Sequence, residues 1–369
     1  MKILILGGTG AIGDALVAEL EKTKKAEVYV TSRKNRSAYS TDMRHYIQCN
    51  AKNYESLCNL LKDRLYDVIV DFLIYEPDEF TDRYRMLCSS CSQYIFLSSC
   101  RVLAASSGSL TEDSPRLLDT SRDKAFLATD EYSLIKSREE NVLTESDLRN
   151  WTIVRPYITY NANRLQLGAF EKEWWLYRVL QGRKILFSRE IGERYTTLTW
   201  GGDVAKVIAE IVLGRKCKSE IIHPVTSQAI KWKEVLSIYC DTLEDVIGAR
   251  PEVVWIESME SRLPGITKYN RYQIKYDRAV DRVFDNSRAL SLMPDSFAFT
   301  NTKDGLRDCL TWFLQKPTFG EILWKMQAYM DIICGDAAKM CEIDNNMTKM
   351  KYLIWRYTPY LKLLEAGMR

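Results

Sequence analysis

The sequence predicts an α/β protein with a doubly wound parallel sheet, a smaller α/β lobe and a helical C-terminal appendage. Short apolar runs alternate with stretches of helical period through the first half of the chain, which is typical of right-handed βαβ units. The 369 residues are 46% hydrophobic and 27% charged, which indicates a globular chain with a real core. The formal net charge of +3 is too small to predict binding to nucleic acid.

The first half of the chain supplies the strands and helices of the predicted sheet. Strands are expected at 2–6, 27–30, 46–47, 68–72, 94–97 and 152–154, with helices that include 53–63, 78–88 and 131–146. After residue 157 the pattern changes to helices at 170–181, 203–213 and 231–246 and short strands at 185–187, 221–225 and 252–256, which predicts a second lobe. The polar stretch 104–124 is predicted to be a mobile loop.

A glycine-rich turn follows the first predicted strand. Gly7, Gly10 and Gly13 have the spacing G-x-x-G-x-x-G between a strand and a helix. Such glycines let the backbone turn tightly and let a pyrophosphate approach the helix N-terminus. A plain tight turn is the alternative, but this context favours dinucleotide binding and a Rossmann-type sheet. The expected cofactor contacts in the turn are Gly7, Thr9, Gly10, Ala11, Ile12 and Gly13.

The end of the second strand bears on the choice of dinucleotide. It reads Thr31-Ser32-Arg33-Lys34-Asn35-Arg36 and has no acidic residue to accept hydrogen bonds from a ribose 2′-hydroxyl. A hydroxyl, an Arg and a Lys suit a 2′-phosphate, because hydrogen bonds to phosphate are strengthened by charge. The sequence therefore predicts NADP, held by Ser32 and Arg33, with NAD as the alternative. A solvated basic turn also fits these residues.

Tyr132 and Lys136 are four residues apart in Y-S-L-I-K, so a helix places them on one face. A neighbouring ammonium stabilises phenolate, which prepares Tyr132 to exchange a proton with a substrate oxygen while hydride moves. Ser98 and Ser99 follow the predicted strand 94–97, at the edge of the sheet where ligands bind.

With these motifs the chain resembles the short-chain dehydrogenase/reductase superfamily, and within it the extended, epimerase/dehydratase-like branch. The matching motifs are GGTGAIG at 7–13, YIFLSS at 94–99, YSLIK at 132–136, TIVRP at 152–156, Asp203-Val204-Ala205 and FDNSRALSLMP at 284–294, and the resemblance covers residues 1–315. It implies that Ser99, Tyr132 and Lys136 are catalytic. It also implies that Asn50, Ala51, Leu73, Ile74, Ser98 and Pro156 line the cofactor, together with Tyr132 and Lys136.

Departures from the family pattern concern the substrate side. Cys100-Arg101 replaces the Asp-Glu pair that dehydratases of this branch use to expel water, so 4,6-dehydration is not expected. Cys100 is a candidate for proton transfer to the substrate, although a small buried side chain is the simpler interpretation. Arg194 is a candidate for contact with a nucleotide diphosphate, with a solvated arginine as the alternative.

The resemblance implies an NAD(P)-dependent oxidoreductase or epimerase that acts on a sugar nucleotide or a related hydroxyl or carbonyl metabolite. The rival hypothesis is a non-catalytic dinucleotide-binding regulator or RNA-binding protein of the same fold. We expect a cytoplasmic protein without a transmembrane segment, because no apolar run approaches the length of a bilayer. A metal site is not expected, because Cys88 and Cys91 form the only CxxC pair and the chain has two histidines and no second pair to complete four ligands.

Three consecutive segments are predicted: a dinucleotide-binding domain at 1–157, a mainly substrate-binding lobe at 158–317 and a helical extension at 318–369. In the extension, apolar residues, mainly Trp, Tyr and Met, recur at helical spacing. The pattern extends to Tyr360 and Leu363. Packing on the second lobe or across a homodimer is the favoured interpretation. A membrane-surface contact and substrate capping are the alternatives.

Overall fold

The computed structural model describes residues 1–62, 64–259 and 270–358. The chain divides into two compact units whose segments interleave along the sequence. The first unit comprises Met1–Asn161, Thr197–Ala229 and Arg282–Thr302, and the second comprises Ala162–Thr196, Ile230–Asp281 and Lys303–Arg369. This division differs from the three consecutive segments predicted above, because the chain returns twice to the first unit.

A parallel sheet of seven strands forms the centre of the first unit. Its order is β10-β6-β5-β4-β1-β2-β3, and every neighbouring pair is parallel. The strands are β1 (Lys2–Leu6), β2 (Glu27–Ser32), β3 (Arg44–Gln48), β4 (Tyr66–Asp71), β5 (Cys91–Leu97), β6 (Trp151–Val154) and β10 (Glu220–Ile222). The predicted fold class is confirmed. The strand order reverses between β1 and β4, and sheets of this type bind ligands at the carboxyl ends of such strands.

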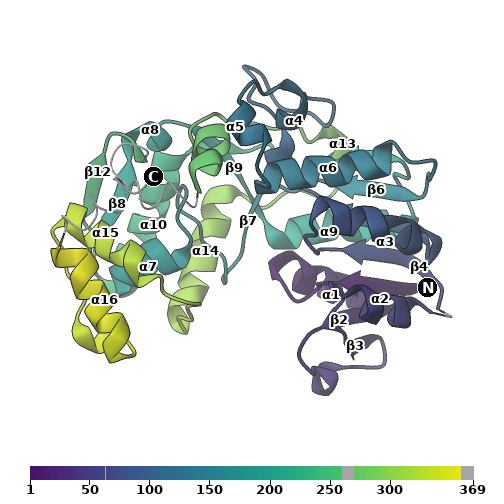
Figure 1. The fold of residues 1–369 in the computed structure, drawn as a ribbon, viewed down its shortest axis with the longest axis horizontal. Coiled ribbons are helices and arrows are strands. Elements are labelled where there is room, and N and C mark those ends of the chain that lie inside the picture. Colours follow the sequence, from purple (N-terminus) through teal and green to yellow (C-terminus); the bar gives the residue numbers. More distant parts are fainter. Residues whose placement is uncertain (63, 260–269, 359–369) are drawn as a thin grey trace. The chain divides into compact units, whose positions relative to one another are not determined.

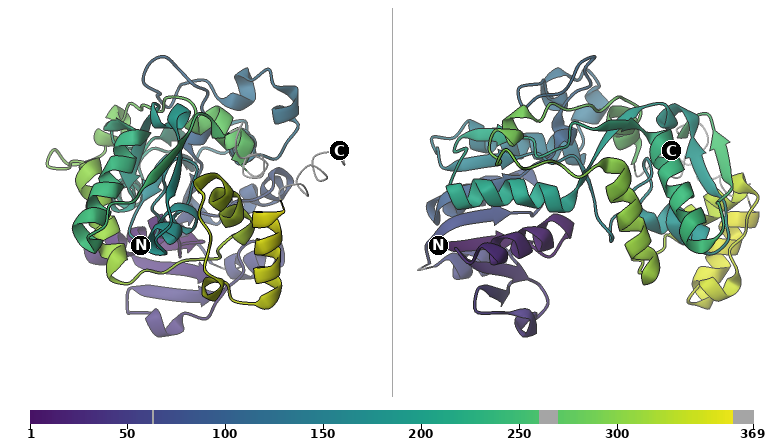
Figure 2. Two further views of the ribbon diagram at one scale, coloured as in Figure 1. Left: turned by 90° about the vertical axis from the view of Figure 1, so that its left-hand side faces the viewer. Right: turned by 180° about the vertical axis from the view of Figure 1, so that it is seen from behind.

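Helices cover both faces of this sheet because its strands are apolar on both sides. Ile3 and Ile5 of β1 pack on one face, and Leu4 and Leu6 pack on the other. The first face is covered by α1 (Ala11–Thr23) and α9 (Gly201–Gly214), the second by α2 (Tyr54–Leu61), α3 (Pro77–Ser89) and α6 (Tyr132–Thr144) (Figure 1). Seen from behind, α1 and α9 lie side by side (Figure 2).

The helix predicted at 203–213 and the strand predicted at 221–225 do not belong to a second lobe. They are α9 and β10, and both complete the first unit. Strand β10 pairs in parallel with β6, with Ile221 opposite Ile153. The fully buried side of α9, including Val204 and Ile208, packs in the same core as α1. Sequence order could not reveal this return, because residues 162–196 of the second unit intervene.

The segment that follows β5 contains a short 3-10 helix at Cys100–Val102 and the short helices α4 (Leu117–Thr120) and α5 (Lys124–Leu127). The polar stretch 104–124 lies in this segment, and backbone hydrogen bonds attach it to residues 283–285. Leu110 N donates to Val283 O at 2.8 Å, and Asp285 N donates to Leu110 O at 2.9 Å. Leu103, which precedes the stretch, also forms an isolated β-bridge with Arg116 inside it. The predicted mobile loop is therefore attached by backbone contacts at several positions.

The second unit combines short parallel strands with helices. Strands β8 (Ile185–Ser188) and β12 (Val253–Ile256) pair in parallel, and the main helices are α7 (Lys172–Leu180), α10 (Trp232–Ile247), α15 (Trp324–Cys334) and α16 (Asn346–Tyr357). Helix α8 (Arg189–Gly192) and helix α14 (Thr302–Gln315) accompany them. A further small sheet consists of β7 (Ile158–Tyr160), β9 (Tyr195–Trp200) and β11 (Ala229–Lys231). Strand β7 belongs to the first unit, and the boundary between the units falls within β9 and β11.

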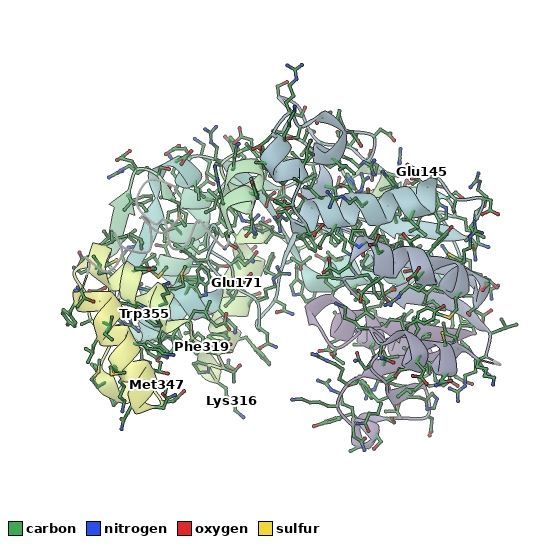
Figure 3. The ribbon with its side chains drawn as sticks, in the orientation of Figure 1. Glu145, Glu171, Lys316, Phe319, Met347 and Trp355 are labelled. Carbon is green, nitrogen blue, oxygen red and sulfur yellow. The ribbon has the colours of Figure 1, made fainter. Side chains whose placement is uncertain are left out.

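The helical C-terminal region predicted from the sequence is present, and it packs within the second unit. Asp331 of α15 is fully buried between Arg178 of α7 and Arg183, at 2.8 Å and 3.2 Å. Tyr352 of α16 donates to Asp331 at 2.6 Å. On the same helix Met347 is 63% exposed, whereas Trp355 packs partly against the cluster that contains Tyr352 (Figure 3).

Tyr360 and Leu363, which were predicted to continue the apolar pattern of this region, lie outside the described residues. Along the part of the chain that is described, none of the helices combines the length and the apolar character that a membrane crossing requires.

Candidate active site

The glycine turn joins β1 to α1 by a close approach of backbone to backbone. Gly7 has φ +71°, and a Cβ on it would lie 2.7 Å from Leu73 Cδ2. A Cβ on Gly13 would lie 2.7 Å from backbone atoms of Gly8, so only glycine lets the helix start against the turn. Gly10 caps α1 without a side-chain hydrogen bond, and a Cβ there would meet nothing within 4 Å. The helix N-terminus is therefore open to an anionic ligand.

The end of β2 is tied to this turn, and basic side chains follow it. Thr31 Oγ1 accepts a hydrogen bond from Gly7 N at 3.2 Å. Ser32 is buried, whereas Arg33 and Lys34 are exposed, and no described residue forms an ion pair with either of them. The arrangement leaves both cations available to an anion beside β2.

Two further arginines act on the first turn of α1. Partial burial raises the pKa of Asp14, whereas Arg36 and Arg44 lower it. Arg44 is anchored by an ion pair with Glu21 at 2.8 Å. The group of basic side chains predicted at the end of β2 therefore also includes Arg44 of β3. Arg44 was not among the residues predicted to hold a 2′-phosphate.

Residues expected to line the cofactor also follow β3. Asn50 is exposed and Ala51 is buried at the carboxyl end of this strand. Because β3 lies beside β2 in the sheet, these residues belong to the same edge as Ser32, and Cys49 N donates to Ser32 O at 2.9 Å.

A buried carboxylate at the end of β4 organises the next part of this edge. Asp71 is 0% exposed and accepts hydrogen bonds at 2.9 Å from Leu73 N and from the hydroxyls of Tyr75 and Tyr94. Burial raises the pKa of Asp71, and these donors oppose the rise. The carboxylate fixes the backbone at Leu73, while the side chain of Ile74 is 45% exposed. Asp71 was not among the predicted site residues, although an acidic residue at the end of an apolar strand can be recognised in the sequence.

Lys136 reaches this place from the second turn of α6. Its Nζ donates to Leu73 O at 3.2 Å and lies 4.3 Å from the centre of the Phe96 ring. It also lies 3.0 Å from Glu139 Oε2, in an ion pair of poorer hydrogen-bond geometry. Lys136 therefore contacts residues at the carboxyl ends of both β4 and β5 and has a carboxylate partner that the sequence analysis did not predict. Its roles in catalysis and in binding the cofactor remain predictions.

Tyr132 is the first residue of α6 and is partly exposed. The Arg101 guanidinium carbon lies 5.2 Å from the centre of its ring, and Arg101 forms an ion pair with Glu131. Ser99 Oγ accepts a hydrogen bond from Arg101 N at 3.2 Å. The structure thus gathers Ser99 and Tyr132 around Arg101, where the related dehydratases were expected to carry an acid.

Ser98 and Ser99 have different environments. Ser98 Oγ donates to Glu140 Oε1 at 2.5 Å, and the same carboxylate pairs with Arg155 at 2.7 Å. All three side chains are buried, so Ser98 belongs to a structural network beneath the site. Ser99 is held only by a backbone N–H among the described residues, and its assignment as the catalytic hydroxyl remains a prediction.

Cys100 is fully buried beside this network, and Pro156 is buried next to it. Its thiol donates to Arg155 O at 2.8 Å, and its backbone N donates to Pro156 O at 3.0 Å. Burial raises the pKa of Cys100 well above its usual value. These contacts describe a packed side chain, and the assignment of Cys100 to the substrate remains a prediction.

Arg194 lies in the second unit, between α8 and β9. Its side chain is exposed, and its backbone is fixed because Arg194 N donates to Ile191 O at 3.0 Å and Arg194 O accepts from Trp232 N at 3.1 Å. Its contact with a substrate also remains a prediction.

His223 was placed in the second lobe by the sequence but follows β10 in the first unit. It is fully buried, and burial lowers the pKa of its imidazole well below the usual value.

Comparisons with known proteins agree with this architecture. Residues 3–156 match the NAD dependent epimerase/dehydratase family. A search of curated proteins found no match to this sequence. Among solved structures, dTDP-glucose 4,6-dehydratase from Bacillus anthracis in complex with NAD is 15% identical, with 86% of this chain and 97% of that chain covered and a TM-score of 0.63. UDP-glucuronic acid 4-epimerase from Bacillus cereus in complex with UDP-glucuronic acid and NAD is 18% identical, with 85% and 99% covered and a TM-score of 0.63.

This chain therefore shares its fold with these two solved structures, in agreement with the predicted fold class. The match to this family model is confined to residues 3–156, which make up less than half of the chain. At these identities the solved structures establish the fold alone.

Proposed function

We propose that this chain is an NAD(P)-dependent oxidoreductase or epimerase that acts on a sugar nucleotide or a related hydroxyl or carbonyl metabolite. One observation carries the proposal: the glycine turn, Leu73 and Lys136 meet at the carboxyl ends of β1 and β4. The strand order reverses at this point, which is where sheets of this class bind dinucleotides.

The residues present fit a dinucleotide. The open N-terminus of α1 would receive the pyrophosphate, Leu73 and Ile74 would line the nicotinamide half, and Lys136 would hold its ribose. The bound dinucleotide supplies or accepts hydride. The chain itself handles the proton: Tyr132 is the acid or base at the substrate oxygen, and Ser99 donates a hydrogen bond to that oxygen.

NADP is the proposed cofactor, with NAD as the alternative. Exposed Arg33 and Lys34 beside the buried Ser32, together with Arg36 and Arg44, support a 2′-phosphate site. The solved relatives named above were crystallised with NAD, which supports the alternative.

A sugar nucleotide is the proposed substrate class, because the relative from Bacillus cereus was crystallised with UDP-glucuronic acid. Arg194 is the proposed contact for its diphosphate. Dehydration is not proposed, since Arg101 and its ion pair with Glu131 stand where an acid would be needed.

The test begins with calorimetry of the full chain with NADP and NAD. The melting temperature is then measured with UDP, GDP, CDP and dTDP in the presence of the tighter dinucleotide. We expect a dinucleotide to bind and one of the four nucleotides to raise the melting temperature further, because a ligand at 100 times its Kd adds about 2.7 kcal/mol to the free energy of unfolding. Arg194→Ala should reduce the increase in melting temperature caused by the nucleotide and leave dinucleotide binding unchanged. Absence of binding by both dinucleotides contradicts the proposal and favours the regulatory or RNA-binding hypothesis.

On a substrate identified in this way, Tyr132→Phe should lower turnover by about 10²- to 10⁴-fold, because it removes a general acid/base. Dinucleotide affinity should be unchanged, because the N-terminus of α1, Leu73, Ile74 and Lys136 are proposed to hold the dinucleotide and remain intact in this variant. A variant with full turnover would remove Tyr132 from the mechanism.

A further inference from the structure

The Glu139 carboxylate faces the Lys136 ammonium, and the function proposed above does not use it. Glu139 is 0% exposed and Lys136 is 1% exposed. Glu139 Oε1 accepts a hydrogen bond from Tyr75 N at 3.2 Å, and Oε2 lies 3.0 Å from Lys136 Nζ. Because both groups are removed from water, the charge of the carboxylate is screened far less than a surface charge would be.

Other charged and titratable groups surround Glu139 on the elements packed against α6. From the end of β4, the Asp71 carboxylate is bonded to the hydroxyls of Tyr75 and Tyr94. From α3, the buried Arg83 guanidinium carbon lies 4.7 Å from the centre of the Tyr75 ring. Two carboxylates, Asp71 and Glu139, thus share this region with two cations, Lys136 and Arg83. Loss of the Glu139 charge leaves the cations in excess.

Two contacts join Glu139 to the residues that are proposed to hold the nicotinamide half of the dinucleotide. It touches Lys136, the residue proposed to hold the nicotinamide ribose, and it fixes the backbone at Tyr75, immediately after the proposed lining residues Leu73 and Ile74. The contacts come from different elements, α6 and the segment after β4, and both involve residues at or next to the proposed nicotinamide subsite.

We propose that Glu139 biases this site toward the oxidised dinucleotide, an inference that rests on the function proposed above. An oxidised nicotinamide ring carries one positive charge, whereas the reduced ring carries none, so a buried carboxylate near it stabilises the oxidised form. The two forms share the same ribose, pyrophosphate and adenine groups, so the contributions of these groups should cancel in the ratio of the two dissociation constants. The change of this ratio on removal of one carboxylate therefore reports the effect of that charge on the nicotinamide ring.

The bias has a chemical consequence for the substrate. When the oxidised dinucleotide is the bound form, the substrate that can react is an alcohol. The carbinol C–H bond would break, its electron pair and hydrogen would pass as hydride to the dinucleotide, Tyr132 would accept the hydroxyl proton, and a carbonyl would remain. Burial raises the pKa of Glu139 to about 7, so the bias is present above that pH and is lost below it.

The test measures Kd for NAD and NADH, and for NADP and NADPH, by calorimetry on the full chain at pH 8.5 and pH 6.0. At pH 8.5, Glu139→Gln should lower the ratio of the reduced-form Kd to the oxidised-form Kd by roughly three- to tenfold. At pH 6.0 the wild type and the variant should have the same ratio. If Glu139→Gln does not fold, the fall of the wild-type ratio between pH 8.5 and pH 6.0 decides the matter.

Two variants on the same helix serve as controls. Glu140→Gln removes an equally buried carboxylate that pairs with Arg155 instead of Lys136. Glu145→Gln removes an exposed carboxylate at the opposite end of α6 (Figure 3). Both should keep the wild-type ratio. The inference is overturned if Glu139→Gln binds both forms with the wild-type ratio at pH 8.5, or if Glu140→Gln shifts the ratio equally. Failure of the wild type to bind any form would instead overturn the proposed function.

Discussion

Asp71 and Glu139 are both buried at the carboxyl end of β4, where water cannot stabilise their charges. Asp71 is compensated by three hydrogen-bond donors, whereas Glu139 has one backbone donor and the Lys136 ammonium. The difference matters for titration, because a carboxylate with fewer compensating partners gains a proton at higher pH.

The protonation of Glu139 should be visible in the stability of the protein. Burial raises its pKa from 4.5 to about 7 in the folded state. Between these values the folded state binds more protons than the unfolded state, so the free energy of unfolding falls as the pH rises from about 4.5 to about 7. A shift of this size corresponds to about 3 kcal/mol. Urea unfolding from pH 5 to pH 8 should show the decline, and Glu139→Gln should flatten it. If the free energy of unfolding changes equally with pH in the wild type and in Glu139→Gln, the pKa of Glu139 is not raised.

The proposed preference for NADP over NAD can also be tested at a single side chain. Arg33→Ala should weaken NADP binding by about tenfold or more, because a charged hydrogen bond to phosphate contributes about 1.5–3 kcal/mol. NAD binding should be unchanged, since NAD lacks the 2′-phosphate. Lys22→Ala, which removes a cation at the other end of α1, is the control and should affect neither. Tighter binding of NAD than NADP by the wild type would show that the basic turn is not a 2′-phosphate site.

At the scale of elements, the turn between β1 and α1 separates two roles of glycine. Gly13 makes room for the backbone of Gly8, whereas Gly10 faces open space at the helix N-terminus. The first role concerns folding, and the second concerns the ligand.

Paired substitutions should separate these roles. Gly13→Ala should lower the free energy of unfolding by about 1–3 kcal/mol, because its Cβ would overlap fixed backbone atoms. Gly10→Ala should lower it by less than about 1 kcal/mol, the effect of changing a helix cap. Both should weaken dinucleotide binding, Gly10→Ala through the methyl group it places where a pyrophosphate would approach. Urea unfolding and calorimetry give the two readouts. If Gly10→Ala binds NADP and NAD as the wild type does, the pyrophosphate does not lie against this turn.

At the scale of the whole molecule, each unit has its own buried polar centre. In the second unit Asp331 joins α15 to α7 and α16 through Arg178, Arg183 and Tyr352. Burial raises the pKa of Tyr352, and Asp331 adds to the rise. The C-terminal helices are thereby part of this unit's core.

Asp331→Ala should lower the free energy of unfolding of the second unit by about 3–5 kcal/mol, because two buried arginines lose a shared partner. The control is Asp241→Ala, which breaks an exposed ion pair with Arg250 and should change it by less than about 1 kcal/mol. Thermal or urea unfolding followed by tryptophan fluorescence gives both values. Equal effects would show that the buried network adds no more than a surface pair.

Much of the first unit could be predicted from the sequence because its elements have local causes. The strand at 2–6, the glycine turn and the helix carrying Tyr132 and Lys136 each follow from period, spacing and residue type over a few positions. The position of Glu139 three residues after Lys136 was equally visible, but its burial was not, because burial depends on β4 and α3 packing against α6.

The sequence by itself determined the class of sheet, the glycine turn between β1 and α1 and the helix that carries Tyr132 and Lys136, since these depend on short-range patterns. Only the tertiary structure decided that α9 and β10 belong to the first unit, that Ser98 is held by Glu140 while Ser99 is not, and that Lys136 is paired with Glu139. The physical reason is that such pairings join segments far apart in the chain or depend on exclusion of water, and neither property is encoded at a single position.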